Sequence, residues 1–132
     1  MIILNYSDRT NKAISVRLCY QEELHDVLAK TKDSGKVGEL SAIVLERDGL
    51  ATLTFAQVEG GAVLMWMPST DLCFHSQGDG TDDNTVSFRI NGEYTEVPAS
   101  YVVKYDLAVE AAVRFVETGV PGVIGLEWEQ DF

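Results

Sequence analysis

The stretch LSAIVLERDGLATLTFAQV, residues 40–58, contains two runs of alternating apolar and polar residues on either side of Asp48-Gly49. Alternation with a period of two indicates β-strands whose two faces meet different surroundings. An Asp-Gly pair tolerates the positive φ angles that a two-residue hairpin turn needs. The stretch therefore predicts a β-hairpin, with one strand over residues 40–47 and the other over residues 50–58.

More strands are expected after this hairpin, at residues 62–68, 71–76, 86–90 and 93–97. The last two flank Asn91-Gly92, which is a second hairpin signal. The polar loop QGDGTDDN, residues 77–84, precedes them and contains no core-forming residue. The middle of the chain therefore predicts an antiparallel meander.

Two segments have the apolar spacing of helices. The first covers about residues 20–32 and lies between a predicted strand at 14–19 and the loop DSGKVGE at 33–39. The second follows Asp106, which can cap it, and ends at Gly119. Its apolar stripe consists of Leu107, Ala108, Ala111, Ala112, Phe115 and Val116.

The segment VIGLEW, residues 123–128, predicts a last strand with Ile124, Leu126 and Trp128 in phase towards the core. Trp128 is then a core anchor that holds the C-terminal strand, and Trp66 and Phe115 are predicted to be core residues as well. Together these elements predict an α+β fold, in which two main helices pack on one face of an antiparallel meandering β-sheet.

The formal net charge of the 132-residue chain is −11 at pH 7, and acids are concentrated after residue 38. Residues 1–38 carry five acids and six bases, a net +1, whereas residues 39–132 carry sixteen acids and four bases, a net −12. An acidic surface repels nucleic acid and membranes and attracts a basic partner through long-range steering. Such a surface also serves solubility alone, so the charge leaves both interpretations open.

Other features favour a soluble cytoplasmic protein with a single domain over residues 1–132. No apolar run approaches the ~20 residues that a membrane span needs. The first residues, MIILNYSDRTNK, lack the basic start and the cleavage site of a signal peptide. Cys19 and Cys73 are too few and too far apart for a disulfide framework and indicate reduced thiols.

Asp71, Cys73 and His75 alternate along one predicted strand and therefore share a face. Successive residues on one face of a strand lie about 6.5–7 Å apart, too far for contact between a nucleophile and its base. Leu72 and Phe74 alternate with them and are expected in the core. The three polar side chains are therefore predicted to face outward as a binding surface rather than as a catalytic set.

Neither a metal site nor a cofactor site is predicted. A metal site on Cys73 and His75 would need further ligands that no motif supplies. The loop with Asp79, Asp82 and Asp83 lacks the ligand spacing of calcium loops and lies between strands rather than helices. The chain also lacks a glycine-rich phosphate loop and a Gly-x-Ser-x-Gly elbow. The acidic loop is better explained as a solvated segment that can meet a basic partner.

The last third of the chain has an ordered combination of features. A hairpin ending in Val97-Pro98 leads to the helix DLAVEAAVRFVETGVP, residues 106–121, and then to a strand containing LEW, residues 126–128. This combination resembles the immunity protein 1 family of bacterial polymorphic toxin systems, over about residues 40–132. The matching positions are Ala108, Ala111, Ala112, Phe115, Thr118, Gly119, Pro121 and Trp128.

The resemblance implies a non-enzymatic cytoplasmic inhibitor that binds the C-terminal domain of one cognate toxin, one to one, and covers its active site. Toxins paired with this family include nucleic-acid deaminases and nucleases, whose active sites attract phosphate, so an acidic inhibitor is physically sensible. Two other classes remain open: a small acidic secretion chaperone that acts as a homodimer, and a small enzyme or ligand-binding module. Direct binding of nucleic acid or of a membrane is not expected.

The family positions are structural, so specificity is expected in variable exposed residues. The predicted contacts to the partner are Asp71, His75, Asp79, Asp82 and Asp83, with Glu46, Asp48 and Glu59 around the first hairpin as the alternative surface.

Overall fold

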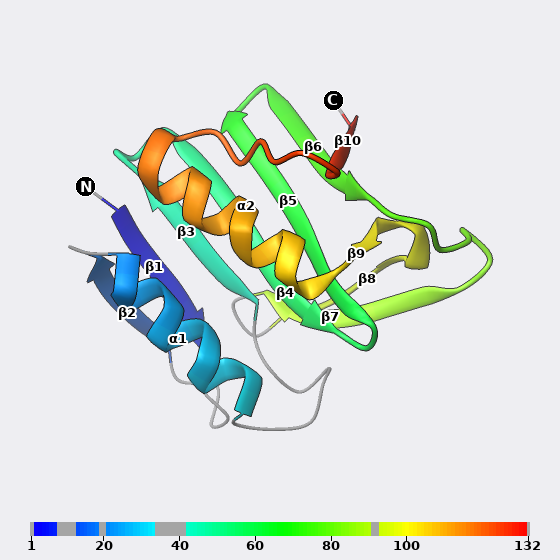
Figure 1. Ribbon diagram of the computed structural model, residues 1–132, viewed down its shortest axis with the longest axis horizontal. Helices are drawn as coiled ribbons and strands as arrows, with labels where there is room; N and C mark the ends of the chain where they lie inside the picture. Colours follow the sequence, from blue (N-terminus) through cyan, green and yellow to red (C-terminus); the bar gives the residue numbers. More distant parts are fainter. Residues whose placement is uncertain (1, 8–12, 19–20, 34–41, 91–92, 132) are drawn as a thin grey trace.

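The computed structural model describes residues 2–7, 13–18, 21–33, 42–90 and 93–131 (Figure 1). The strands are β1 (Ile2–Ser7), β2 (Ala13–Leu18), β3 (Ile43–Arg47), β4 (Ala51–Val58), β5 (Gly61–Ser69), β6 (Leu72–Gln77), β7 (Thr85–Ile90), β8 (Glu93–Pro98), β9 (Val102–Val103) and β10 (Glu127–Gln130). The helices are α1 (Gln21–Asp33) and α2 (Tyr105–Thr118), and Ala99–Tyr101 forms a 3₁₀ turn.

Among the described residues, eight strands form one sheet in the order β10-β6-β5-β4-β3-β1-β2, and β9 pairs with β5. Strands β7 and β8 form a separate hairpin, and each strand pairing is antiparallel. Figure 1 shows α1 and α2 on the same side of the large sheet. The predicted α+β fold, with its antiparallel sheet and two helices on one face, is confirmed.

Each face of the sheet has its own apolar cluster. The larger cluster joins α1 and α2 to the sheet, and Phe115 of α2 is fully buried in it. Ala108, Ala111 and Ala112 present small side chains along the same helix, and all three are fully buried. The smaller cluster packs the β7–β8 hairpin against the other face of β4 and β5, through residues such as Phe88 and Val63. The meander therefore does not continue in the plane of the sheet, because its last hairpin folds across the back.

The quoted stretch forms the predicted hairpin. Strand β3 pairs with β4, and the turn has positive φ angles at Asp48 (53°) and Gly49 (70°). The loop at 34–39, the start of the predicted strand at residues 40–41, and the Asn91-Gly92 turn lie outside the described residues. Strand β1 was not predicted; it lies between β2 and β3, where it buries Leu4 completely.

Both ends of α2 are fixed, but not entirely as predicted. Asp106 lies inside the first turn, Lys104 is the N-cap residue, and the cap has no side-chain hydrogen bond, so the prediction that Asp106 caps the helix is wrong. Its carboxylate still favours the positive end of the helix dipole. Gly119 ends the helix as predicted, with a left-handed φ of 84°. Nη1 of Arg47 donates to the carbonyl oxygens of Phe115 and Val116, at 3.3 and 2.5 Å, which satisfies acceptors that the helix end leaves open.

The C-terminal strand is shorter than predicted. Ile124 is 98 % exposed, because Ile124 and Gly125 form a turn in which the Leu126 N–H donates to the carbonyl oxygen of Val123. Leu126 is buried, and Trp128 of β10 is partly buried against the main cluster. The Trp128 ring meets the Trp66 ring edge-on, with centroids 5.9 Å apart. The strand thus holds the chain end through Trp128, but the predicted alternation fails at Ile124.

Candidate partner-binding surface

The loop that follows β6, beside the strand pair β6–β10, carries Asp79, Asp82 and Asp83, three of the acidic residues singled out from the sequence. Strand β10 pairs with β6, so that Glu127 lies opposite Gln77 and Glu129 lies opposite His75. The loop after β6, residues 78–84, packs on the 3₁₀ turn: the Gly78 N–H donates to the Ser100 carbonyl oxygen at 2.6 Å. A Cβ at Gly78 would lie 1.7 Å from the Val102 carbonyl oxygen, so only glycine fits there. The loop is therefore tied to the fold.

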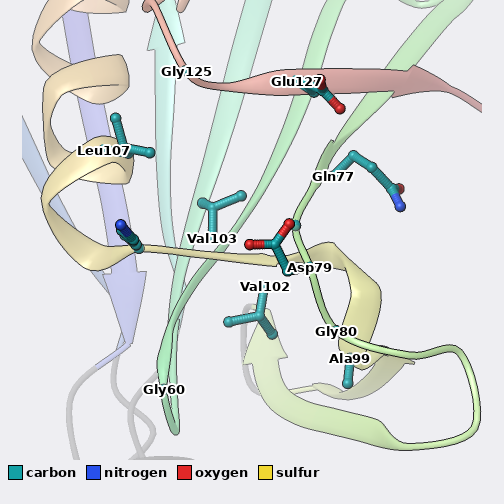
Figure 2. Close-up of a pocket in the computed structure, with 12 residues that line it drawn as sticks. Gly60, Gln77, Asp79, Gly80, Ala99, Val102, Val103, Leu107, Gly125 and Glu127 are labelled. Atoms are coloured by element: carbon teal, nitrogen blue, oxygen red, sulfur yellow. The ribbon is translucent and has the colours of Figure 1, made fainter.

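A cleft of about 470 Å³ opens between this loop, β9, β10 and the start of α2. Figure 2 shows Asp79 of the loop and Glu127 of β10 at this cleft. Lys104 also lines it and partly offsets the two carboxylates. Apolar contacts come from Val102, Val103 and Leu107.

A smaller hollow of about 160 Å³ lies beside the cleft, and Gln77 lines both. Its other lining residues are His75, Asp82, Pro98, Ser100, Tyr101 and Glu129. Asp82 is held in place because the Ser100 hydroxyl donates to its Oδ1. Two exposed carboxylates, of Asp82 and Glu129, thus stand at the mouth of this hollow.

The imidazole of His75 forms the floor of the smaller hollow, and the prediction that it faces outward is wrong. His75 is only 3 % exposed. Its ring stacks on Tyr101, with centroids 3.6 Å apart and planes at 8°. Its Nδ1 lies 2.6 Å from Oδ1 of Asp131, whose backbone N–H donates to the Cys73 carbonyl oxygen. The chain end and the 3₁₀ turn cover this face of β6, which local alternation cannot reveal.

Of the other two residues predicted to face outward, one is exposed as predicted and the other is not. Cys73 is buried like His75, whereas Asp71 is exposed in the turn before β6. Of the two residues expected in the core, Phe74 stacks on Trp66 with centroids 5.2 Å apart, but Leu72 is 39 % exposed.

The field at the smaller hollow is negative. Burial raises the pKa of the Tyr101 hydroxyl, and the carboxylates of Asp131, Glu129 and Asp82 raise that pKa further, because each disfavours a phenolate. Burial also raises the pKa of the Cys73 thiol, with Asp131 adding to the effect. A raised thiol pKa opposes formation of the thiolate that a nucleophilic cysteine needs.

The predicted contact residues fall into separate places. Asp79, Asp82 and Asp83 share the loop after β6, whereas Asp71 precedes that strand, and six residues of strand span about 20 Å. Glu46 lines a different hollow, formed by β1, β2 and β3, and Asp48 follows β3 in the turn before β4.

Glu59 lies in the turn at the other end of β4, next to Gly60, which lines the larger cleft. The three residues of the alternative surface therefore do not lie together, because Glu59 and Asp48 are at opposite ends of β4.

Two further exposed carboxylates, of Glu127 and Glu129 on β10, were not among the contacts predicted from the sequence. A signal was available: both flank Trp128, so alternation along the strand places them on the face opposite its ring. Within the described residues, no group of three or more His, Cys, Asp or Glu side chains is arranged to hold a metal ion. Neither described helix is long and apolar enough to cross a membrane.

The fold and the site define a small acidic α+β protein with exposed carboxylates on β10 and on the loop after β6. The family model for immunity protein Imm1 matches residues 15–130. The chain therefore belongs to the Imm1 immunity protein family, and its general function is that of an immunity protein, which neutralises a cognate toxin. The match begins in β2, whereas the resemblance seen in the sequence covered only about residues 40–132. No curated protein matches the chain.

Proposed function

We propose that this protein inhibits one toxin by binding its C-terminal domain, one to one, and covering the active site. The main observation in support of this proposal is a group of four carboxylates, called the acidic edge. It consists of Asp79 and Asp82 of the loop after β6 and of Glu127 and Glu129 of β10. Two adjoining hollows present these four carboxylates on one side of the molecule. Such a surface complements a basic cleft and speeds encounter with it.

The toxin class that this surface fits best is an enzyme acting on nucleic acid, such as a deaminase or a nuclease. Enzymes of this kind neutralise backbone phosphates with Lys and Arg, so their active-site clefts are basic. Carboxylates at the edge of the inhibitor would occupy the positions that phosphates take. We expect the neighbouring reading frame to encode this toxin domain.

The protein itself is proposed to be catalytically inert and to work in the cytoplasm. The Cys73 thiol lies 3.8 Å from Oδ2 of Asp131 and has a raised pKa, an arrangement that opposes nucleophilic catalysis. His75 is committed to Asp131 and Tyr101. A free, buried cysteine such as Cys73 suits a reducing compartment.

The acidic loop is tested by its effect on association. The variant carrying Asp79→Asn, Asp82→Asn and Asp83→Asn should bind the toxin domain more slowly than the wild type, with a flatter dependence of the association rate on ionic strength, because rim charges steer encounter. A matched control carries Glu46→Gln, Asp48→Asn and Asp71→Asn, which remove the same charge elsewhere. Equal slopes for wild type and loop variant, with a changed slope for the control, would place the interface near Glu46, Asp48 or Asp71 instead.

Mass in solution separates the proposal from the secretion-chaperone alternative. An inhibitor of this kind should be a monomer that forms a 1:1 complex with the folded toxin domain. A stable homodimer that binds only an unfolded segment of its partner would support the chaperone instead.

A further inference from the structure

The smaller hollow contains a buried ring nitrogen, Nε2 of His75, that has no hydrogen-bond partner among the described residues. A carboxylate accepts hydrogen bonds, so Nδ1 of His75 carries the proton in its 2.6 Å contact with Asp131 Oδ1. In the neutral ring Nε2 is then an acceptor, and it is buried without a hydrogen bond among the described residues. Oε2 of Glu129 lies 3.8 Å from it, beyond hydrogen-bond distance. Buried polar atoms nearly always have a hydrogen-bond partner. One that lacks a partner and lies at a hollow therefore indicates that a group from another molecule, called the guest below, binds there.

The size of the hollow limits that guest. Its volume of about 160 Å³ exceeds the ~30 Å³ share of one water molecule in the liquid. It is well below the ~300–1,000 Å³ of sites for drug-sized ligands. A space of this size suits the end of one amino-acid side chain better than a free metabolite.

The polar groups around the hollow determine the charge of the guest. Asp82, Glu129 and Nε2 of His75 offer acceptors, and Asp131 adds negative charge behind the ring. The Ser100 hydroxyl occupies one oxygen of Asp82 and leaves the other for a guest. The Glu129 side chain is 63 % exposed, so a partner can reach it.

We infer that this hollow is the receptor for a basic side chain of the toxin domain, which inserts between Asp82 and Glu129 and donates to Nε2 of His75. The inference rests on the proposed function and names the contact that anchors the complex. An arginine fits best, because its planar guanidinium has five donors and no acceptor. A lysine ammonium could satisfy the same three acceptors as a point charge.

The anchoring contact should control dissociation, whereas the rest of the acidic edge controls association. Removing one partner of a buried, hydrogen-bonded charge pair mainly raises the dissociation rate. The double variant Asp82→Asn, Glu129→Gln should therefore dissociate from the neighbouring toxin domain about tenfold faster or more. Its matched control is Asp79→Asn, Glu127→Gln, which removes the same charges from the same loop and strand at the larger cleft. The control should bind more slowly and dissociate at nearly the wild-type rate.

Two readouts identify the guest itself. Each Arg and Lys of the toxin domain is replaced by Ala, and double-mutant cycles are measured against the Asp82/Glu129 variant and against the control. One basic residue should couple to the first variant and not to the second. In the complex, the side-chain ¹⁵N resonance of His75 Nε2 should move to the position of a hydrogen-bonded acceptor, while the exposed His25 stays unchanged.

Three results would overturn the inference. The first is that the two double variants dissociate from the toxin domain at equal rates. The second is that no basic residue of the toxin domain couples to Asp82 and Glu129. Either result would show that the complex forms without using the hollow. An unchanged His75 Nε2 resonance in the complex would show that no donor reaches the ring. If the wild-type protein does not bind the toxin domain at all, the proposed function fails first.

Discussion

Ser76 supports the surface described above from inside the sheet. Strand β9 pairs with β5 at Ala62 and Val63, and β6 pairs with the same edge from Met65 onward, so Leu64 lies between the two pairings. The Leu64 N–H donates to Ser76 Oγ at 3.0 Å, and the Ser76 hydroxyl donates to the Tyr101 carbonyl oxygen at 2.6 Å. One fully buried hydroxyl thus connects β5, β6 and the segment that carries Tyr101.

The substitution Ser76→Ala should leave two backbone groups without partners, the N–H of Leu64 and the carbonyl of Tyr101. Each buried group left unsatisfied costs about 1–3 kcal/mol. Partial relaxation and the lost desolvation of the hydroxyl reduce the sum, so the free energy of unfolding should fall by about 2–4 kcal/mol. The loss should be concentrated where Tyr101 and Ser100 line the smaller hollow.

The assay is urea unfolding followed by tryptophan fluorescence, together with hydrogen exchange of the Leu64 amide. A suitable control is Ser69→Ala, because the exposed Ser69 hydroxyl accepts only a 3.3 Å bond from the Asp71 N–H among the contacts described for it. That variant should change the free energy of unfolding by about 0.5 kcal/mol or less. If Ser76→Ala is as stable as the control and the Leu64 amide exchanges at the wild-type rate, the connecting role of Ser76 is refuted.

Three further predictions concern stability, and each is checked by the same denaturation measurement. Phe115→Ala should cost about 3–5 kcal/mol through a core cavity, because Phe115 is fully buried; a smaller cavity cost would mean that the core collapses around it. Trp128→Ala should cost less, about 1–3 kcal/mol, since Trp128 is partly buried against Trp66; an unchanged stability would show that β10 is not held by this ring. Gly78→Ala should destabilise by about 1 kcal/mol or more, because its Cβ would lie 1.7 Å from the Val102 carbonyl oxygen, and wild-type stability would mean that the loop can move away.

Local pattern predicted the parts of the fold that depend on neighbours in the chain. The Asp48-Gly49 hairpin and the Gly119 end of α2 depend on a few adjacent residues, and both form as predicted. The predicted N-cap residue, Asp106, was wrong by two positions, because the first residue of a helix also depends on the conformation of the segment before it. Strand β1 was missed because its six residues give a short pattern, and its burial comes from pairing with β3, about forty residues later.

The candidate site was harder to predict because distant segments build it. Alternation placed Cys73 and His75 on one face correctly, but it could not show that Asp131 and Tyr101 cover that face. The acidic loop was recognised from composition. Glu129 comes close to this loop only because β10 pairs with β6, about fifty residues earlier in the sequence. Local sequence patterns do not reveal such a pairing.

The claim that the protein neutralises a toxin is tested most directly by titrating the purified chain into the toxin domain of the neighbouring reading frame while its activity on nucleic acid is measured. Toxin activity should fall linearly and vanish at one inhibitor per toxin, and the inhibited mixture should contain a 1:1 complex. Full toxin activity in the presence of a large molar excess of the folded protein would contradict the account.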